Sequence, residues 1–339
     1  MASMKEVAAR AGVSVATVSH VLRGTKRVSP ELTERVRQAA RELGYVPNLQ
    51  ASALRTGRTQ TFGVLIPDLS NPFFVALLHA LAPAARAAGK VLMVYESEND
   101  ASSERQGLER MVAGQVDGLI WIPVSVDEAP VGELPTRGVP VVTIDRPLPG
   151  ADAVVADHVA GGGLLAAHLK RLGHGRVALL SGPPHLPSSR GRRRGFLEAF
   201  SPAQPVWEAV TGFTHELSPE AVRRLDGGGY DAVVCPNDMV ALGAVRHLAK
   251  RGVRVPQDVS VVGFDDVAWA SLMEPALTTV RQPLAAIGAA AVRLLLERIQ
   301  DPGRATRHVV MPVELVVRGS TAAPSAARRA EGSAPPVYS

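Results

Sequence analysis

The chain has 339 residues, and its 37 Lys and Arg against 32 Asp and Glu give a formal net charge of +5. Residues 1–60 carry ten basic and four acidic side chains, so the excess positive charge lies in the first sixth of the chain and indicates a polyanion-binding module on a near-neutral body. The single cysteine, Cys235, excludes an internal disulfide framework and a multi-cysteine zinc site, and no apolar run approaches the ~18 residues that a membrane span needs.

Three short helices are expected in residues 1–46. Met4–Arg10 is the first, and Gly12 supplies a sharp turn after it. Ser14 is a good N-cap for a second helix, Val15–Leu22, whose inward face is Val18, Val21 and Leu22. The third begins at Ser29-Pro30-Glu31 and ends at Gly44, with an apolar stripe at Leu32, Val36, Ala39 and Leu43. These patterns predict a compact all-α helix-turn-helix headpiece.

The second helix has the features of a DNA-reading helix. Its outward residues are small or polar, which lets the helix backbone approach base edges in the major groove. Val15 and Ala16 suit thymine methyls, and His20 suits a purine acceptor. Thr17, Ser19 and Arg23 are expected to fix the register on phosphates. The alternative is an ordinary three-helix bundle with a solvated basic face.

From Thr61 onward, short β-branched runs alternate with helical stretches. Apolar strands that are each followed by a helix predict parallel sheets covered on both faces, and their number favours two α/β lobes. A long helix is expected at Leu284–Gln300, and residues 320–339 are expected to form a disordered tail because they are rich in Ala, Ser and Pro. The expected strands are 62–66, 91–95, 117–122, 139–144, 176–181, 230–235 and 259–264, followed by a last apolar run, HVVMPVELVV.

Several motifs in order resemble the LacI/GalR (lactose-repressor/galactose-repressor) family of transcriptional regulators. The resemblance begins in the headpiece with VAARAGVSVATVSHVL and covers nearly the whole chain except the tail. It continues through NPFF (71–74), GFDD (263–266), PALTTVRQP (275–283) and PVELVVRGS (312–320). The family implies a body like that of periplasmic sugar-binding proteins, built from two doubly wound parallel-sheet lobes.

The resemblance also implies a hinge helix in residues 47–60. Pro47 restrains its entry, Asn48 can cap it, and Leu49–Arg55 gives two turns or fewer. A helix this short is marginal alone because nucleation is costly, so it needs a partner or DNA to fold against. Leu54 matches the family leucine that enters the minor groove at the operator centre and kinks the duplex. The alternative is that Leu54 only packs within a linker.

The effector-binding and dimerisation body is expected over residues 61–319, and the resemblance implies that the chain crosses between the lobes three times. The crossings are expected near Asp157, near Val280–Pro283 and near Arg307–Val309. Lobe one would then comprise about 61–157 and 284–306, and lobe two about 158–281 and 309–319. Facing lobes of this kind enclose a site at the carboxyl ends of their strands.

Seven residues are expected to face the effector. Asn71, Phe73 and Phe74 follow the first body strand, and Asp157, Arg192, Asn237 and Asp265 match ligand positions of the family. An aromatic face with carboxylate, amide and guanidinium groups suits a ring that bears several hydroxyls. Alternatives remain for several side chains: Phe73, Phe74 and Trp121 as core, Asp266 as a helix cap, and Arg190, Arg193 and Arg194 as a solvated surface. Leu186 replaces a polar residue of some family members, so no single member's effector can be carried over.

These features predict a homodimeric transcriptional regulator, expected to be a repressor, that binds palindromic operator DNA under the control of a small polar effector. The expected effector is a sugar or sugar derivative, and the alternative is a nucleoside or purine. A small-molecule transport-binding protein is a rival of another class, but it would carry a signal peptide and lack a basic headpiece. An enzyme is not expected, since we find no nucleophile elbow, P-loop, dinucleotide fingerprint or metal-ligand cluster. No cofactor, metal or membrane association is expected, and the expected location is the cytoplasm, on the nucleoid when DNA is bound.

Overall fold

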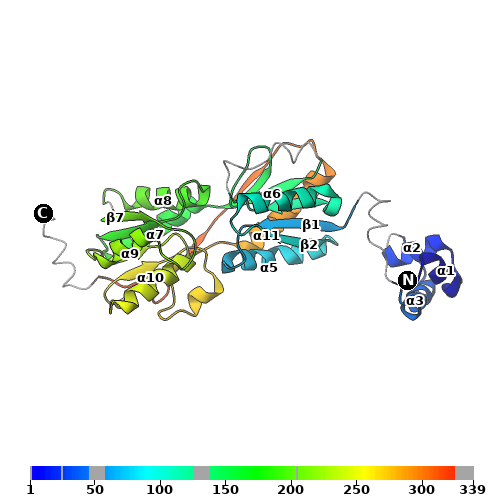
Figure 1. Ribbon diagram of the computed structural model, residues 1–339, viewed down its shortest axis with the longest axis horizontal. Coiled ribbons are helices and arrows are strands. Elements are labelled where there is room, and N and C mark those ends of the chain that lie inside the picture. The colour runs from blue at the N-terminus through cyan, green and yellow to red at the C-terminus, as the bar shows by residue number, and fades with distance from the viewer. Residues whose placement is uncertain (1, 24–25, 46–57, 125–137, 204, 325–339) are drawn as a thin grey trace. The chain divides into compact units, whose positions relative to one another are not determined.

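The computed structural model describes residues 2–23, 26–45, 58–124, 138–203 and 205–324. The chain divides into two compact units, Met1–Thr59 and Gln60–Ser339, which we describe separately (Figure 1). The first holds the helices of the headpiece and the second holds the strands of the body. This division agrees with the expected fold class of a small all-α unit joined to an α/β body.

The headpiece contains the three expected helices, α1 (Met4–Ala11), α2 (Val15–Arg23) and α3 (Pro30–Glu42). Each begins with a serine that satisfies a free backbone N–H: Ser3 accepts from Glu6, Ser14 from Thr17, and Ser29 from Leu32. Gly12 ends α1 in the left-handed conformation, at φ +61°. The three helices enclose their own core, made by Val7, Ala8, Ala11, Val18, Val21, Val36, Ala39 and Ala40.

Lobe one of the body is built on a six-stranded parallel sheet with the order β11-β5-β4-β3-β1-β2. β2 and β11 are therefore its two edge strands. The strands are β1 (Thr61–Ile66), β2 (Val91–Glu96), β3 (Gly118–Trp121), β4 (Val141–Ile144), β5 (Asp152–Ala156) and β11 (His308–Met311).

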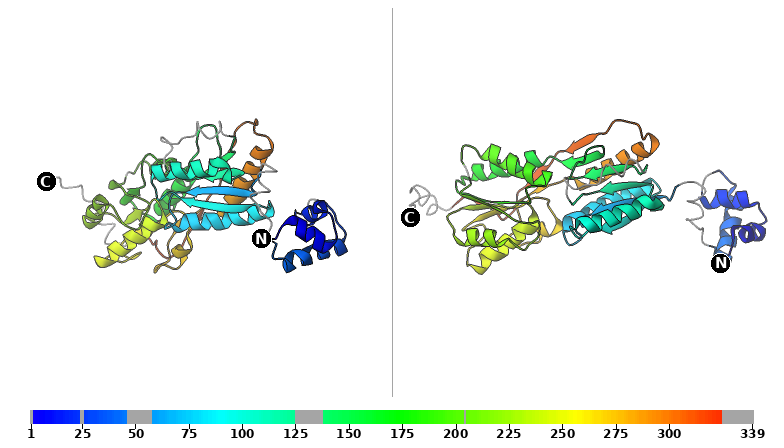
Figure 2. Two further views of the ribbon diagram at one scale, coloured as in Figure 1. Left: turned by 45° about the vertical axis from the view of Figure 1, so that its right-hand side comes forward. Right: turned by 45° about the horizontal axis from the view of Figure 1, so that its top comes forward.

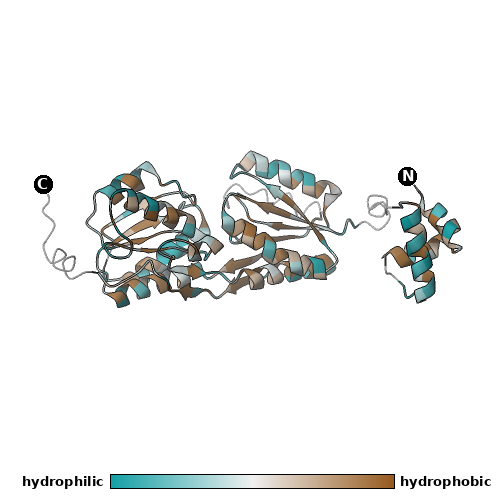
Figure 3. Cartoon of the chain, turned by 90° about the horizontal axis from the view of Figure 1, so that it is seen from below, coloured by the Kyte–Doolittle hydropathy of each residue, from teal (hydrophilic) through white to brown (hydrophobic). Residues whose placement is uncertain are grey.

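Helices cover both faces of this sheet, and the side chains on both faces of β1 are apolar and buried against them. Phe62, Val64 and Ile66 face a core shared with α5 (Pro72–Ala87) and α11 (Leu284–Gln300). Leu65 points the other way, into a core shared with α6 (Ala101–Arg110) and the π-helical turn η1 (Met111–Gln115). In Figure 1, α5 and α6 accordingly lie on opposite sides of β1 and β2, and Figure 3 shows apolar strands between helices with polar outer surfaces.

Lobe two repeats this arrangement on a four-stranded parallel sheet with the order β7-β6-β8-β9. α7 and α8 share a core with one face of the sheet, and α9 and α10 pack on the other face (Figure 2). The elements are β6 (Val177–Ser181), β7 (Trp207–Val210), β8 (Ala232–Val234), β9 (Ser260–Val262), α7 (His158–Leu172), α8 (Pro187–Phe200), α9 (Pro219–Asp226), α10 (Asp238–Lys250) and the 3-10 turn η3 (Ala268–Ser271).

α7 and α8 approach each other at backbone distance. A Cβ built on Gly195 would lie 1.9 Å from the Val159 carbonyl oxygen, and one on Gly162 would lie 2.1 Å from that of Arg192. No side chain fits in either position without moving one helix away from the other. The two helices therefore form one rigid layer, which carries both His158 and Arg192.

Two expected boundaries are wrong. The last crossing between lobes was expected near Arg307–Val309, but β11 pairs in parallel with β5 and so belongs to lobe one. The chain crosses only after Met311 and then forms β12 (Glu314–Val316), which pairs antiparallel with β10 (Thr279–Arg281). The expected tail also begins too early, because Ser320 is fully buried and its Oγ donates to the Val261 carbonyl oxygen. The polar composition of residues 320–339 does not indicate this buried contact.

Candidate DNA-reading helix and effector site

The outer face of α2 presents the residue types expected of a reading helix. Val15 is 41% exposed and Ala16 is exposed beside it, while Ser19 and His20 are half-buried. The Thr17 hydroxyl lies 2.9 Å from Ser14 Oγ, so both side chains are engaged at the start of the helix. Three further candidates fall outside what the structure describes: the Arg23 side chain, Asn48 and Leu54.

Three of the expected effector residues converge in lobe two. Arg192, on α8, lies 3.1 Å through Nη2 from Asp265 Oδ1, and its guanidinium stands 3.8 Å from the centre of the Phe264 ring. Its Nη1 donates to the carbonyl oxygen of Pro236, the residue before Asn237. Asn237 caps α10 by accepting from Val240, and its amide donates to the Phe213 carbonyl oxygen. Arg192 thus joins α8 to the Asp265 side chain and to the backbone beside Asn237.

Asp265 combines burial with unusual backbone geometry. Its φ is +114°, a region that L-residues rarely adopt, and such strain gathers at functional sites. Oδ1 accepts from Gln282 Nε2 at 2.8 Å as well as from Arg192. Burial raises the pKa of Asp265 to about 6, although Arg192 and Gln282 oppose this rise. The carboxyl group therefore titrates close to the neutral range.

A second group of polar residues joins this cluster to lobe one. Asp145 follows β4 with φ +66°, and its Oδ1 lies 2.9 Å from Nε2 of His158, the first residue of α7. Its Oδ2 accepts from the hydroxyl of Ser188, on α8, at 3.1 Å. His158 Nδ1 in turn accepts from Arg192 Nε at 3.4 Å. A chain of buried contacts thus runs from Asp145 through His158 and Arg192 to Asp265.

The charge states of Asp145 and His158 follow from their burial and from the charged groups beside them. Burial lowers the pKa of His158, with Asp145 opposing, so the imidazole is neutral and can accept from Arg192 at Nδ1. Burial would raise the pKa of Asp145, but His158 and the guanidinium groups of Arg146 and Arg192 hold it well below its usual range. Asp145 is therefore ionised at neutral pH. Of the two carboxyl groups in this series of contacts, Asp265 is the one that titrates near neutral pH.

The remaining expected effector residues lie apart from these contacts. Asn71 caps α5 through Oδ1, and Phe73 and Phe74 are buried in the lobe-one core with their rings edge to face. Asp157 caps α7 by accepting from Ala160. These placements agree with the core alternative for the two phenylalanines. Asp145, His158 and Gln282 were missed as candidates, although Asp145 follows a predicted strand at the edge where a ligand site forms.

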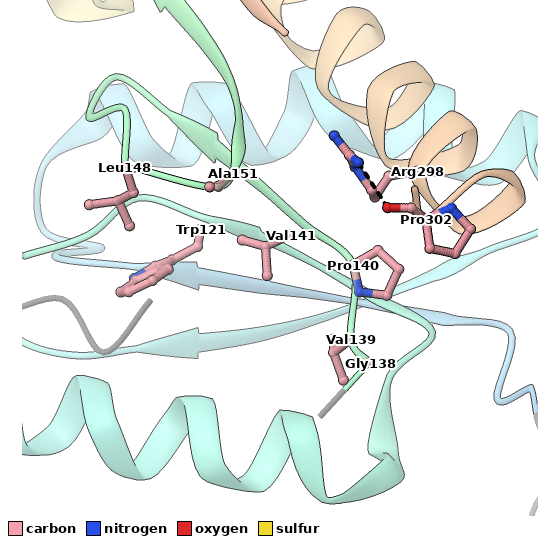
Figure 4. Close-up of a pocket in the computed structure, with 10 residues that line it drawn as sticks. Trp121, Gly138, Val139, Pro140, Val141, Leu148, Ala151, Arg298 and Pro302 are labelled. Atoms are coloured by element: carbon pink, nitrogen blue, oxygen red, sulfur yellow. Dashed lines mark hydrogen bonds between the residues drawn. The ribbon is translucent and has the colours of Figure 1, made fainter. Parts of the chain in front are cut away.

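Trp121 and Asp266 also have structural roles. Trp121 is fully buried, and its Nε1 donates to Glu104. It borders a small cavity of about 140 Å³ within lobe one, where Figure 4 shows its ring near Val141 and Leu148. Asp266 does not cap the following turn, whose N-cap position is Val267 and has no side-chain hydrogen bond, and it pairs instead with Arg281 and Arg318. Within the described ranges, no helix is long and apolar enough to cross a membrane and no cluster of metal ligands forms.

Two family models match the chain. Residues 3–48 match the model of bacterial regulatory proteins of the lacI family, and residues 166–321 match that of the periplasmic binding protein-like domain. The chain is 33% identical to the HTH-type transcriptional regulator DegA of Bacillus subtilis, over 93% of this chain and 97% of that one. It is 32% identical to the HTH-type transcriptional repressor PurR of Aliivibrio fischeri, over 94% and 98%. These relatives are transcriptional regulators rather than enzymes.

Solved structures give the same result for the whole fold. The Lac repressor dimer bound to operator and the anti-inducer ONPF matches with a TM-score of 0.83 and 30% identity, over 95% of this chain and 99% of that one. A LacI-family regulator from Enterococcus faecium with bound ribose matches with a TM-score of 0.70 and 29% identity, over 78% and 100%. The chain is a member of the LacI family of transcriptional regulators, with a helix-turn-helix headpiece and a periplasmic-binding-protein-like body.

Proposed function

We propose that the chain is a dimeric repressor whose operator affinity is set by a small polar effector held at Arg192, Asn237 and Asp265. The observation that carries this proposal is the buried chain of contacts from Asp265 to Asp145, because it connects the candidate ligand residues of lobe two directly to lobe one. The proposed units are the headpiece in residues 1–46, the hinge in 47–60 and the two-lobed body from residue 61 to Ala322.

An effector controls the repressor only if it binds one lobe arrangement more tightly than another. A hydroxyl group that bonds to Asp265 or Arg192 competes with the contacts these residues make with each other and with His158. Rearranging them changes the support that His158 gives to Asp145 across the junction. The preferred arrangement would then be passed through the hinge to the headpieces.

A sugar or sugar derivative is the effector that the side chains favour. Asp265 accepts from hydroxyl groups, Asn237 both donates and accepts, and the Arg192 guanidinium offers several donors in a fixed plane. The E. faecium relative with bound ribose supports this class. A purine or nucleoside is the second candidate, favoured by the PurR relative and by the Phe213 and Phe264 rings beside Arg192.

For the headpiece, we propose that Val15, Ala16 and His20 read bases and that Ser14, Thr17, Ser19 and Arg23 position α2 on phosphates. Asn48 would cap the hinge helix, and Leu54 would enter the minor groove at the centre of a palindromic site. The operator-bound Lac repressor dimer supports a dimer here as well. We further propose that the protein acts in the cytoplasm and catalyses no reaction.

The experiment begins with a thermal-shift screen of the full chain against ribose, other sugars, nucleosides and purines. An operator selected from random DNA then serves to measure affinity with and without each hit. R192K keeps the positive charge but loses the planar fork, and D265N keeps the shape but loses the carboxylate, so both should lose the ligand response. R224K, on exposed α9, is the matched control. A full response in R192K and D265N would contradict the site, and no operator from the selection would contradict the function.

A further inference from the structure

A second cavity, of about 630 Å³, lies at the lobe junction beside the exposed side of α8. Ala156 and Val310 line it from lobe one, Asp157 lines it at the crossing, and Arg190, Arg193 and Arg194 line it from lobe two. Its volume is within the range of about 300–1,000 Å³ that is typical of small-molecule sites. Arg192, Asn237 and Asp265 do not line this cavity. His158 lines it and also contacts Arg192.

The three arginines make this cavity strongly basic. Positions i, i+3 and i+4 of a helix share one face, so Arg190, Arg193 and Arg194 project together. Arg193 pairs with Glu208 at 2.6 Å, and Arg194 makes only a long, exposed pair with Glu198 at 3.8 Å. Arg190 donates to the carbonyl oxygens of Pro184 and His185, and no carboxylate of the described chain pairs with it. Neither glutamate lines the cavity.

Besides the three arginines, Asp157 and His158 line the cavity, and its other lining residues are glycine or apolar. A Cβ on Gly191 would lie 2.8 Å from that of His158, so this glycine lets α8 sit directly on the start of α7. The Asp157 carboxylate is already engaged in capping α7. Opposite the arginines, Val310 is 58% exposed on the edge strand β11. The cavity therefore offers guanidinium groups on one side and an apolar contact on the other.

We propose that this cavity binds a small organic anion, with its phosphate or carboxylate group on Arg190 and Arg194 and its apolar part against Val310. Guanidinium forks match both oxyanions in geometry, and charge-assisted hydrogen bonds of this kind are strong. A molecule in contact with both lobes stabilises the lobe arrangement that brings these residues together. The site is a second regulatory input, and it does not depend on the identity of the effector at Arg192.

The test uses the full chain with three probes: inorganic phosphate, phenyl phosphate and benzoate, each at an ionic strength held constant with NaCl. Phenyl phosphate should raise the Tm and bind more tightly than inorganic phosphate in calorimetry, and comparison with benzoate separates phosphate from carboxylate recognition. R190Q/R194Q should weaken phenyl phosphate binding about tenfold or more. R223Q/R224Q is the matched control on α9. It also removes one arginine that pairs with no carboxylate among the described residues, and one exposed i,i+4 pair, that of Arg224 with Glu220.

V310E tests the contribution of lobe one to the cavity and leaves all the arginines in place. A carboxylate in place of this exposed valine should repel the anion, so V310E should also lose phenyl phosphate binding while its Tm in NaCl stays that of the wild type. The proposal is supported if R190Q/R194Q and V310E lose phenyl phosphate binding and R223Q/R224Q retains it. Equal binding in R190Q/R194Q and the wild type, retention in V310E, or no response of the wild type to any probe would overturn it.

Discussion

Asp145 Oδ1 lies 2.9 Å from His158 Nε2, and this contact joins the end of a lobe-one strand to the first residue of a lobe-two helix. Both side chains are buried, and the second oxygen of Asp145 is occupied by Ser188. The relative positions of the lobes are therefore coupled to a charged group in a region of low dielectric. A lobe movement that separates Asp145 from His158 must break or replace these contacts.

D145N should destabilise the body by about 3 kcal/mol, because it leaves the buried Arg146 guanidinium without its carboxylate partner at 3.7 Å. S188A should cost about 2 kcal/mol, because it removes one hydrogen bond to the ionised carboxylate. Chemical denaturation followed by circular dichroism measures both. E198A, which removes an exposed i,i+4 partner of Arg194, should stay within about 0.5 kcal/mol of the wild type. A D145N variant as stable as E198A would show that the junction charge is not held by this pairing.

The contribution of Asp265 to stability should fall as pH rises through the acidic range. Its pKa is raised from 3.8 to about 6 in the folded state, so between these values the folded protein binds more protons than the unfolded one. The resulting penalty is complete above pH ~6, on the order of 3 kcal/mol, and is absent below pH ~4. D265N cannot titrate, so its stability relative to the wild type should increase with pH across this window. Parallel pH profiles of the two proteins would refute the assignment.

The N-cap of the reading helix should be measurable separately from DNA contact. S14A removes the oxygen that accepts from Thr17 N–H and should destabilise the headpiece by about 1 kcal/mol. S19A, in the middle of the same helix, should leave stability nearly unchanged while lowering operator affinity. Hydrogen exchange of α2 amides in the full chain gives the stability, and anisotropy with labelled operator gives the affinity. The cap assignment would be wrong if S19A lost more protection than S14A.

The dimer should depend on the exposed edge strand β2. Val91 is 67% exposed and Met93 is 38% exposed on this strand, and an apolar edge of this kind pairs readily with another chain. V91K should raise the dimer dissociation constant about tenfold or more, as measured by sedimentation equilibrium. V310K places the same change on the opposite edge strand of the same sheet and should leave the dimer intact. If V310K raised the dimer dissociation constant as much as V91K does, β2 would be excluded as the specific dimer contact.

L54A should lower operator affinity and reduce DNA bending, because an inserted apolar side chain unstacks a base step and kinks the duplex. Unstacking a base step costs a few kcal/mol that contacts with the bent duplex repay, so L54A should lose those contacts together with the bend. Affinity is measured by anisotropy and bending by energy transfer between fluorophores at the ends of the operator. L69A changes an exposed leucine of the body and should alter neither. Unchanged affinity and bending in L54A would remove this residue from the interface.

Much of the architecture could be predicted from sequence because strong local signals coincide with tertiary packing. Capping serines, Gly12 and the apolar spacing of α2 and α3 predict the headpiece, since each helix must bury the stripe that its sequence carries. Runs such as 62–66 predict buried parallel strands for the same reason. β5 and β7 were not expected, since short runs flanked by polar residues resemble loops until neighbouring strands pair with them.

The candidate site was predicted less completely. Arg192, Asn237 and Asp265 lie in distinctive motifs, and the structure brings their segments together. Asp145 and His158 meet only because two lobes meet, and no spacing along the chain encodes a distance between lobes. For Phe73 and Phe74, the position after a strand favours a ligand contact and the structure buries both rings in the lobe-one core, so their contact with an effector stays a prediction.

The close packing of α7 on α8 limits how this regulator can be redesigned. Gly162, Gly191 and Gly195 leave no space for a side chain between the two helices, so a transplanted α8 must keep glycine at its two positions or it will shift His158 and Arg192 together. New ligand specificity can therefore be introduced through the side chains that point away from α7, whereas exchange of the whole helix would alter both the ligand site and the lobe junction. Libraries that hold these three positions constant should yield folded, responsive variants far more often than libraries that vary them.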